Sequence, residues 1–328
     1  MLTVSSTDDR CNAVGNEQFS LTGAKLIGTS PNVLAFVTSS ETSASGSVSL
    51  SNIEWDTYTI ALSDASQDVA GTVPFSPLTI DPSSTQTFQF ILQPAANPSL
   101  LVSVADASTL AGISNANVAI ADGGVNESLV TDHATFSQNN WSGGQYASQD
   151  GGIDDSNAGT LTLLANASGT YSTSTTDWLI SNTFDVGGTA STFNTLSWTP
   201  ATEPPNITLE FQVAANNDDA TWNFVGPDGT ASTYFTSTTS TLPASLAGNR
   251  YFRYEVFMST QDPNATPVLH GVSVDFTANC VPPAQTLFTS ITPGTYSVDV
   301  TAPNYVEATG TAVVGTGESS TTILMTQS

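Results

Sequence analysis

The sequence predicts an all-β protein built from two successive copies of one β-sandwich repeat, the second of which is interrupted by a large inserted β-sandwich. Three observations lead to this prediction. Short runs rich in Val, Ile, Leu, Phe and Tyr are separated by Ser, Thr, Gly, Asn and Pro, which is typical of brief strands joined by turns. Two parts of the chain resemble each other at an offset that increases abruptly along the sequence. Alternation of apolar and polar residues then recurs within the additional length.

The composition limits the classes of partner. The chain has 328 residues and 39% apolar content, which is enough for two or three domains with a core each. Its formal net charge is -25, because 29 Asp and Glu residues stand against four cationic side chains, Lys25, Arg10, Arg250 and Arg253. Four cationic side chains cannot neutralise the phosphate groups of these partners, and we therefore expect no binding to nucleic acid or anionic membranes. No transmembrane segment is present in the sequence, and residues 1–10 lack a signal-peptide pattern.

The first copy of the repeat is predicted over residues 1–97. Its opening segment, LTVSSTDDRCNAVGNEQFSLTGA from Leu2, aligns without gaps with LVSVADASTLAGISNANVAIADG from Leu101, at an offset of 99. Further along, SVSLSNIEWDTYTIAL from Ser47 matches QTLFTSITPGTYSVDV from Gln285, at an offset of 238. Each copy ends in a further strand-like run. The two matches predict that both copies have the same order of strands.

The second copy is predicted to be discontinuous, over residues 98–136 and 280–328. Because the offset grows between the two matches, this copy contains about 139 additional residues. We place them at 137–279, where period-two alternation is clear in residues 207–213 and 272–276. Such alternation requires one buried and one solvated face, so the insertion is predicted to be an antiparallel sandwich of its own. Loop tips accept insertions of this kind because few buried contacts cross them.

The two cysteines, Cys11 and Cys280, are predicted to form one long-range disulfide. Neither has a CxxC partner or a nearby His, which argues against a zinc or thioredoxin-like site. Two free buried thiols are the alternative. A bridge would tie the first copy to the point where the chain leaves the insertion, and on the chain-entropy model it would stabilise the fold by roughly 4–5 kcal/mol.

The repeat resembles the carboxypeptidase regulatory-like, or transthyretin-like, family. The residues that carry the resemblance are Ile291-Thr292-Pro293-Gly294-Thr295-Tyr296 and the following Ala302-Pro303-Asn304-Tyr305. The resemblance implies two tandem seven-stranded transthyretin-like or Ig-like sandwiches without enzymatic activity of their own. The first copy departs from the pattern, since Trp55-Asp56 replaces Pro293-Gly294.

The insertion resembles the jelly-roll modules of bacterial surface proteins that are related to galactose-binding and laminin-G-like folds. The similar stretches include ATWNFVGPDGT from Ala220 and GNRYFRY from Gly248. Relatives of this kind often bind carbohydrate and often hold a structural calcium ion. The resemblance therefore directs the search for a ligand to the insertion.

Three groups of candidate site residues follow. Sugars stack on aromatic rings and accept hydrogen bonds from cationic groups, so possible ligand-binding residues are Trp141, Tyr146, Trp222, Arg250 and Arg253. Oxygen-rich loops make Asp150, Asp154, Asp155, Asp218 and Asp219 candidate calcium ligands, with solvated loop carboxylates as the alternative. Candidate N-glycosylation sites are Asn126, Asn140, Asn166, Asn206 and Asn264, each in an N-x-S/T sequence.

No catalytic residues are predicted. The two histidines, His133 in an expected strand of the second copy and His270 beside a strand of the insertion, have no nucleophile or metal-ligand spacing around them. We therefore predict a non-enzymatic, extracellular or cell-surface protein with no cofactor other than the candidate calcium. The leading hypothesis is a structural or adhesive subunit of a pilus-like filament or stalk that self-assembles into a filament or surface layer. The alternative is a carbohydrate-binding accessory module of a secreted enzyme.

Overall fold

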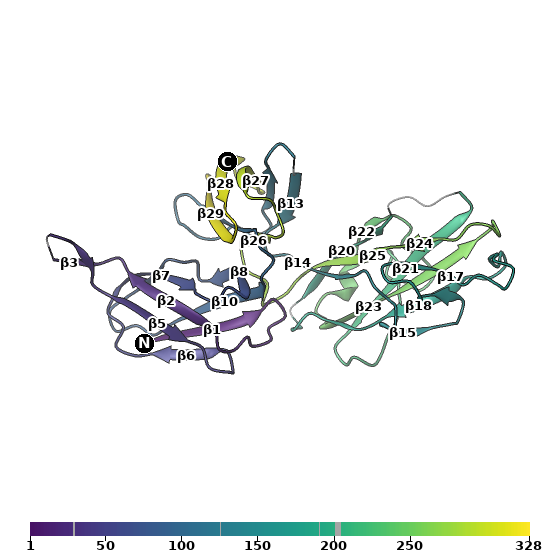
Figure 1. The fold of residues 1–328 in the computed structure, drawn as a ribbon, viewed down its shortest axis with the longest axis horizontal. Helices are drawn as coiled ribbons and strands as arrows, with labels where there is room; N and C mark the ends of the chain where they lie inside the picture. Colours follow the sequence, from purple (N-terminus) through teal and green to yellow (C-terminus); the bar gives the residue numbers. More distant parts are fainter. Residues whose placement is uncertain (29, 125, 190, 201–204) are drawn as a thin grey trace. The chain divides into compact units, whose positions relative to one another are not determined.

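The computed structural model describes residues 1–28, 30–124, 126–189, 191–200 and 205–328, and they form an all-β protein (Figure 1). Its described part contains one short 3-10 helix, η1 (Ala244–Leu246), and no α-helix. No helix in these ranges is long and apolar enough to cross a membrane. The chain divides into two compact units, Met1–His133 with Cys280–Ser328, and Ala134–Asn279. Each unit is described by itself below.

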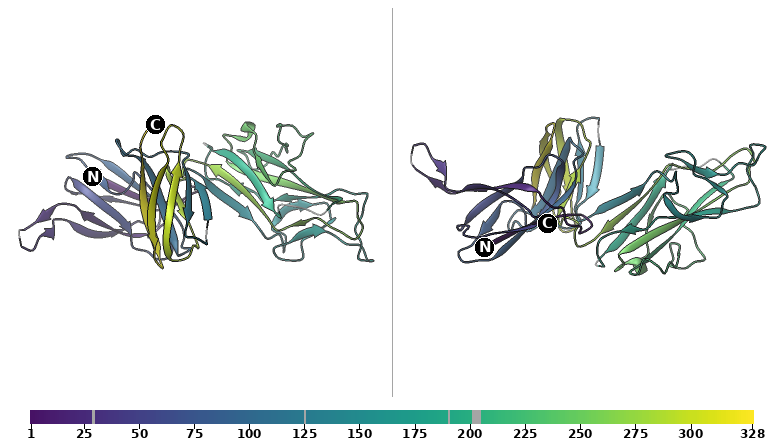
Figure 2. Two further views of the ribbon diagram at one scale, coloured as in Figure 1. Left: turned by 90° about the horizontal axis from the view of Figure 1, so that it is seen from above. Right: turned by 60° about the horizontal axis from the view of Figure 1, so that its bottom comes forward.

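The first sandwich comprises eight of the strands that the structure describes, in two sheets. Its four-stranded sheets have the orders β6 (Ser47–Leu50), β1 (Leu2–Asp8), β10 (Gln86–Pro94), β8 (Gln67–Val73), and β5 (Val37–Glu41), β2 (Gln18–Gly23), β7 (Asp56–Leu62), β9 (Leu78–Ile80). Alternate residues of these strands form one core that includes Leu2, Val4, Phe19, Leu21 and Phe88. A separate hairpin, β3 (Leu26–Ile27) and β4 (Val33–Leu34), extends away from these sheets (Figures 1 and 2).

The second sandwich lies in the same unit and is made of seven described strands. Its sheets have the orders β26 (Gln285–Phe288), β11 (Ser99–Asp106), β29 (Glu318–Met325), and β13 (Asn126–Val130), β12 (Asn117–Ala121), β27 (Gly294–Thr301), β28 (Ala308–Val314). Its core includes Leu100, Val102, Val118, Ile120 and Tyr296. The resemblance implied seven strands in each sandwich, and the first departs from this number because it has the additional edge strand β8.

The two sandwiches share one strand plan. In each, the first strand pairs in parallel with the last, β1 with β10 and β11 with β29. The first strand also pairs antiparallel with a second neighbour, β1 with β6 and β11 with β26. Tyr58 and Tyr296 occupy the same place. Each ring is fully buried, and each hydroxyl donates a hydrogen bond to the carbonyl oxygen four residues earlier, at 3.0 and 2.8 Å. The sequence match at the offset of 238 thus corresponds to equivalent positions.

The gap-free alignment of the two opening segments is wrong by one residue in the first strand. Leu2 pairs with Leu50, and the equivalent pair in the second sandwich is Leu100 with Phe288, so Leu2 corresponds to Leu100 and not to Leu101. The amide of Asp8 bonds to the carbonyl of Asn12, whereas that of Asp106 bonds to Ala111. The second copy therefore has one more residue in this turn, and the offset of 99 applies only from the second strand onward.

The insertion occupies one defined loop. In the first sandwich, residues 42–46 connect β5 to β6, and in the second the corresponding connection between β13 and β26 contains residues 134–279. Thr42 and Thr131 mark equivalent positions, because each is buried and its hydroxyl accepts a backbone N–H at 3.0 Å. The expected boundary at 136/137 is three residues late, since β14 (Ala134–Gln138) pairs with a strand of the insertion.

The unit Ala134–Asn279 has two facing layers and a small third sheet. Its strands are β14, β25 (Gly271–Thr277), β20 (Thr192–Thr199) and β22 (Thr239–Thr241); β15 (Tyr146–Gln149), β18 (Asp177–Ser181), β23 (Tyr251–Thr260), β19 (Phe184–Asp185) and β21 (Ile207–Asn216); and β16 (Ile153–Asp154), β17 (Leu161–Leu163) and β24 (Val268–Leu269). Rings from the two larger sheets meet in the core, where Phe252 lies 5.4 Å from Phe136 and 4.8 Å from Phe193. The jelly-roll resemblance of this unit stays a prediction.

Candidate functional site

Strand β23 positions the two arginines that the sequence singled out. Along this strand Phe252, Tyr254 and Val256 are fully buried, while the intervening residues are partly exposed. The alternation directs Arg253 outward from the core, and β23 pairs with β21 along ten positions on one side. Arg250 immediately precedes the strand. The two guanidinium groups are therefore presented by a rigid element of the fold.

Arg253 is stacked on Trp222. Its Cζ lies 4.4 Å from the centre of the indole ring, and its Nε and Nη2 both donate to Thr183 Oγ1, at 2.9 and 2.8 Å. The same hydroxyl donates to Asp219 Oδ1 at 2.7 Å. Burial lowers the pKa of Arg253, and the charge of Asp219 opposes this shift. This cluster, hereafter the Arg253 cluster, combines an aromatic face with a cation and a carboxylate.

Arg250 is held by an acidic partner. Its Nε and Nη2 donate to the two carboxylate oxygens of Asp185 at 2.7 and 2.8 Å, and its backbone N–H donates to Asn217 Oδ1. The bidentate bond to Asp185 raises the pKa of Arg250. Since both partners are partly exposed, the pair contributes more to orientation than to stability.

The loop after β21 contains both Asp218 and Asp219, and it brings Asp219 to this cluster. Asp218 accepts hydrogen bonds from the amides of Ala220 and Thr221 and from the Thr221 hydroxyl, and these bonds lower its pKa. The carboxylates are thus occupied by donors of their own loop and by Thr183. Among the described residues, no group of three or more His, Cys, Asp or Glu side chains is placed to hold a metal ion.

The other predicted calcium ligands lie elsewhere in the unit. Asp150 accepts the amides of Gly152 and Trp178 at 3.0 Å each, and Asp154 accepts that of Ser156. The hydrogen bonds from Ser156 lower the pKa of Asp154. Asp155 follows β16 at a partly exposed position. The structure therefore divides the five predicted carboxylates between the residues around β16 and the loop after β21, and calcium binding stays a prediction.

Trp141 does not fit the binding prediction. Its ring is fully buried, its Nε1 donates to the hydroxyl of Tyr254 at 2.8 Å, and that hydroxyl donates to Gln138. A tryptophan whose N–H is satisfied inside the core cannot stack on a ligand. Tyr146 is partly exposed on β15, where its hydroxyl accepts a hydrogen bond from Gln149, and it is not part of the Arg253 cluster.

The remaining predicted residues are dispersed. His133 lies just before β14 and not in a strand, 3.4 Å from Asn115, and His270 lies 3.2 Å from the carbonyl of Gly159. Four candidate glycosylation sites are exposed, Asn126, Asn166, Asn206 and Asn264, whereas Asn140 is half-buried and its side chain accepts bonds from Ser142.

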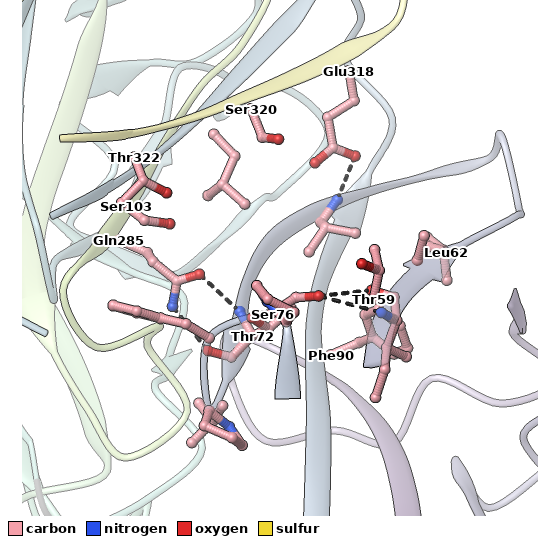
Figure 3. A pocket seen from close by; sticks show the side chains of 18 of the residues that line it. Thr59, Leu62, Thr72, Ser76, Phe90, Ser103, Gln285, Glu318, Ser320 and Thr322 are labelled. Carbon is pink, nitrogen blue, oxygen red and sulfur yellow. Dashed lines mark hydrogen bonds between the residues drawn. The ribbon is translucent and has the colours of Figure 1, made fainter. Parts of the chain in front are cut away.

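The structure also contains a groove in the unit Met1–His133 with Cys280–Ser328 that sequence reasoning missed. It has a volume of about 1460 Å³ and lies between strands β7 and β8 of the first sandwich and the outer face of β11 and β29. Ser103, Ser320 and Thr322 line one side, and Thr59 and Leu62 line the other (Figure 3). The alternation of β29 leaves its outward residues polar or exposed, and sequence alone does not show that a second sheet faces them.

Side chains of the second sandwich occupy the free edge of β8 within this groove. Gln285 is buried, and its amide both accepts from the N–H and donates to the carbonyl of Thr72, at 3.0 and 2.9 Å (Figure 3). Glu318 accepts the N–H of Val69 at 2.9 Å. Burial of the Glu318 carboxylate raises its pKa to about 7, the Val69 bond opposes this, and nearby Asp68 adds to it.

A disulfide joins Cys11 to Cys280, with their Cα atoms 5.3 Å apart and a separation of 269 positions in sequence. Cys11 lies in the turn after β1, and Cys280 is the first residue after the insertion. Near the same place, the amide of Ala284 donates to Asp132 at 3.1 Å. The disulfide therefore ties one end of the connection between β13 and β26 to the first sandwich, and the Ala284–Asp132 hydrogen bond links the two ends of that connection to each other.

Comparisons with known proteins identify no family. No protein-family model and no curated protein matches the chain. Among solved structures, the shaft pilin SpaA of Lactobacillus rhamnosus GG is 10% identical over 100% of this chain and 96% of that one, with a TM-score of 0.18. A variant of BcpA, the major pilin subunit of Bacillus cereus, is 8% identical over 99% of each chain, with a TM-score of 0.31. The minor pilin of Streptococcus agalactiae is 8% identical over 100% and 95%, with a TM-score of 0.21. With TM-scores this low, we draw no conclusion about this chain from the similarity.

Proposed function

We propose that this protein is an extracellular structural subunit of a surface appendage, such as a pilus-like filament or stalk, from which residues 134–279 are displayed. The observation that carries the proposal is the bridge between Cys11 and Cys280. It provides a covalent path between residues 1 and 328 that does not pass through residues 12–279. Tension applied between those two residues would therefore bypass most of the first sandwich and the whole insertion.

Three further features support the same function. Disulfides persist in oxidising surroundings, which favours a location outside the cell. The four Lys and Arg residues offer few cleavage sites to trypsin-like proteases, which suits an exposed protein. An insertion in a loop also fits this function, because its sequence could vary without changing the sandwich that carries it.

Single-molecule pulling tests the mechanical part of the proposal. A full chain pulled between residues 1 and 328 should lengthen by about 20 nm with the bridge intact, and by about 110 nm after reduction, at roughly 0.35 nm per residue. A Cys11→Ser, Cys280→Ser variant is the matched control and should behave like the reduced protein. Release of residues 12–279 while the bridge is intact would contradict the bypass.

Electron microscopy tests the location. Antibody against residues 134–279 should label a filament or the envelope of the source cells, and the label should remain after the cells are washed. A freely diffusing monomer in the medium would contradict a role as an appendage subunit.

The Arg253 cluster favours a second candidate function, carbohydrate binding by the unit Ala134–Asn279. An arginine, an indole ring and a loop carboxylate lie together there, which are the groups that recognise sugars. A glycan array, run with and without calcium, should show binding that Arg253→Ala or Trp222→Ala removes, and Tyr146→Ala should leave it unchanged. A blank array counts against this function and against an accessory role in a secreted enzyme.

A further inference from the structure

A buried carboxylate in the groove has one oxygen without a partner. Asp68, at the start of β8, is 1% exposed and lines the groove. Its Oδ2 accepts the N–H of Ala96 at 3.0 Å, whereas its Oδ1 is buried and has no hydrogen-bond partner among the described residues. Buried polar atoms in folded proteins are nearly always satisfied, because an unsatisfied one costs free energy. The Asp68 Oδ1 atom therefore indicates a bound group at this end of the groove.

A second carboxylate lies beside Asp68. Glu318 Oε2 accepts the N–H of Val69, the residue that follows Asp68, at 2.9 Å (Figure 3). Both carboxylates thus adjoin the same peptide group of β8. In each, a backbone N–H holds one oxygen, which fixes the orientation of the carboxylate and leaves its other oxygen for a further bond. Burial raises the pKa of Glu318 to about 7, and the charge of Asp68 adds to this shift.

No cationic side chain of the groove neutralises this pair. The charged residues in its described lining are Asp64, Asp68 and Glu318, all of them acidic. The Lys and Arg residues of this unit are Lys25 and Arg10, and neither is among the lining residues. Neighbouring carboxylates in partly buried surroundings repel each other unless a positive group lies between them. The pair therefore requires either a proton or a cation from solution.

The connection between β10 and β11 brings a further oxygen to the same place. Asn97 lines the groove and immediately follows the residue whose N–H bonds to Asp68, and its Oδ1 accepts the Ser99 hydroxyl at 3.1 Å. The amide of Ser99 lies 3.5 Å from the carbonyl oxygen of Gly317, which precedes Glu318. The start of β8, this connection and the start of β29 therefore meet at one end of the groove. The groove volume of about 1460 Å³ leaves room for water molecules there.

We propose that Asp68, Asn97 and Glu318 bind a divalent calcium ion where β8 of the first sandwich meets β29 of the second. Calcium takes about six to eight oxygens from carboxylates, amides and waters, so two carboxylates and one amide suffice when water fills the other positions. The ion would satisfy Asp68 Oδ1 and remove the repulsion between the carboxylates.

A cation accounts for this site better than a proton does. Above pH 7 the Glu318 carboxyl is mostly ionised, because its pKa is about 7. The formal net charge of -25 also concentrates cations near the surface of the protein. The site is separate from the carboxylates of the insertion that the sequence singled out, and it does not depend on the proposed appendage function.

Calcium titration of the chelator-treated full chain tests the proposal. In isothermal titration calorimetry the wild type should bind one more ion than the Asp68→Asn, Glu318→Gln variant, with a Kd on the order of 10⁻⁴ to 10⁻³ M, as in extracellular calcium modules. Any ion bound by the insertion contributes equally to both proteins. Asp68→Asn alone should weaken the site at least about 10-fold. Asp64→Asn, which changes the other carboxylate of the groove, is the matched control and should bind like the wild type.

Hydrogen exchange measured by mass spectrometry locates the ion. At about 10 mM calcium chloride, openings of β8 and β29 that release the ion should become about 10- to 100-fold rarer in the wild type, and amide exchange there should slow by that factor. Sodium chloride of equal ionic strength should not reproduce the effect. The Asp68→Asn, Glu318→Gln variant should show no response to calcium in these strands, and circular dichroism verifies that it is folded.

The pH dependence tests Glu318 as a ligand. A proton on Glu318 competes with the ion, and its pKa is about 7, so the calcium affinity of the site should rise about 10-fold between about pH 6 and pH 8. Glu318→Gln should bind more weakly and lose this dependence.

Three results would overturn the proposal. Equal numbers of ions bound by the wild type and by the Asp68→Asn, Glu318→Gln variant would show that these residues hold no calcium. Equal protection by sodium chloride would show that only charge screening is at work. Protection of β8 and β29 at low pH, without any effect of calcium at pH 8, would show that a proton alone satisfies the pair.

Discussion

Single residues at equivalent positions show how the two sandwiches are specified. Tyr58 and Tyr296 each fill a core and return a hydroxyl hydrogen bond to the backbone, and the Thr-Tyr match in sequence indicated both. Asp8 and Asp106 end the first strands and accept the N–H groups of the following turns. For Asp106, the bonds from Ser108 and Thr109 hold its pKa well below the usual range. These residues determine where the chain turns at the ends of the strands, which the apolar pattern alone does not specify.

The tyrosine corner provides a residue-scale prediction. Tyr296→Phe removes a hydrogen bond from a buried hydroxyl and keeps the ring, so the free energy of unfolding of its unit should fall by about 1 kcal/mol. Hydrogen exchange of β12 and β27 measured by mass spectrometry checks this. Tyr234→Phe, at a partly exposed ring of the other unit, is the control and should leave that unit unchanged. An equal loss in both variants would contradict the assignment.

Glu318 provides a pH prediction. Because its pKa is raised to about 7 in the fold, protonation favours the folded state, and the contribution to stability is complete below the ordinary pKa of 4.5 and is lost as the pH rises through about 7. The unit that contains Glu318 should therefore be less stable at pH 8 than at pH 5.5 with respect to this group. Glu318→Gln should flatten the dependence in urea titrations followed by hydrogen exchange, and the exposed Glu127→Gln should not.

At the scale of elements, the disulfide joins a turn of the first sandwich to the end of the insertion. Both cysteines belong to the same compact unit, so the bridge constrains that unit and leaves Ala134–Asn279 outside its direct influence. Sequence suggested the pairing by elimination. The Cα separation of 5.3 Å shows that the fold brings the two positions within bonding reach.

Removal of the bridge should therefore affect one unit only. The Cys11→Ser, Cys280→Ser variant should lose about 5 kcal/mol of stability in the unit Met1–His133 with Cys280–Ser328, if the chain-entropy model applies. Hydrogen exchange reports this unit, while tryptophan fluorescence reports the other, since Trp55 is the single tryptophan outside Ala134–Asn279. A shift of the fluorescence transition by the same amount would show that the two units unfold together.

For the whole molecule, the insertion is expected to be an independent folding unit. Ala134 pairs with Phe276 in the ladder of β14 and β25, so its two ends are neighbours. Residues 134–279 expressed alone should unfold with the same midpoint as in the full chain. The other unit, with His133 joined to Cys280 by a short Gly-Ser linker, should also remain folded, and its free energy of unfolding should change by less than about 0.5 kcal/mol. Failure of either part to fold alone would show that the two compact units are not independent folding units.

Much of the architecture follows from local pattern, and the candidate sites follow from it only in part. Alternation marked β21 and β25 because period-two burial is written into neighbouring residues. Trp141 was wrongly predicted to bind a ligand, because the sequence near a turn does not distinguish a tryptophan that faces solvent from one that is buried against Tyr254. The exposed hairpin of β3 and β4 was missed because LIGTSPNVL has the composition of a strand and turn inside a sheet.

The sequence by itself determined the all-β class and predicted the repeat, the inserted segment and the pairing of the two cysteines, because strand alternation and internal similarity are properties of neighbouring residues and of fixed offsets. Only the tertiary structure decided which aromatic rings are buried, that Gln285 and Glu318 cover the edge of β8, and that a groove lies beside β29. Those features depend on which sheets face each other across residues far apart in the chain. Exposure of the hairpin of β3 and β4 is of the same kind, since a strand is buried or exposed according to whether another surface covers it.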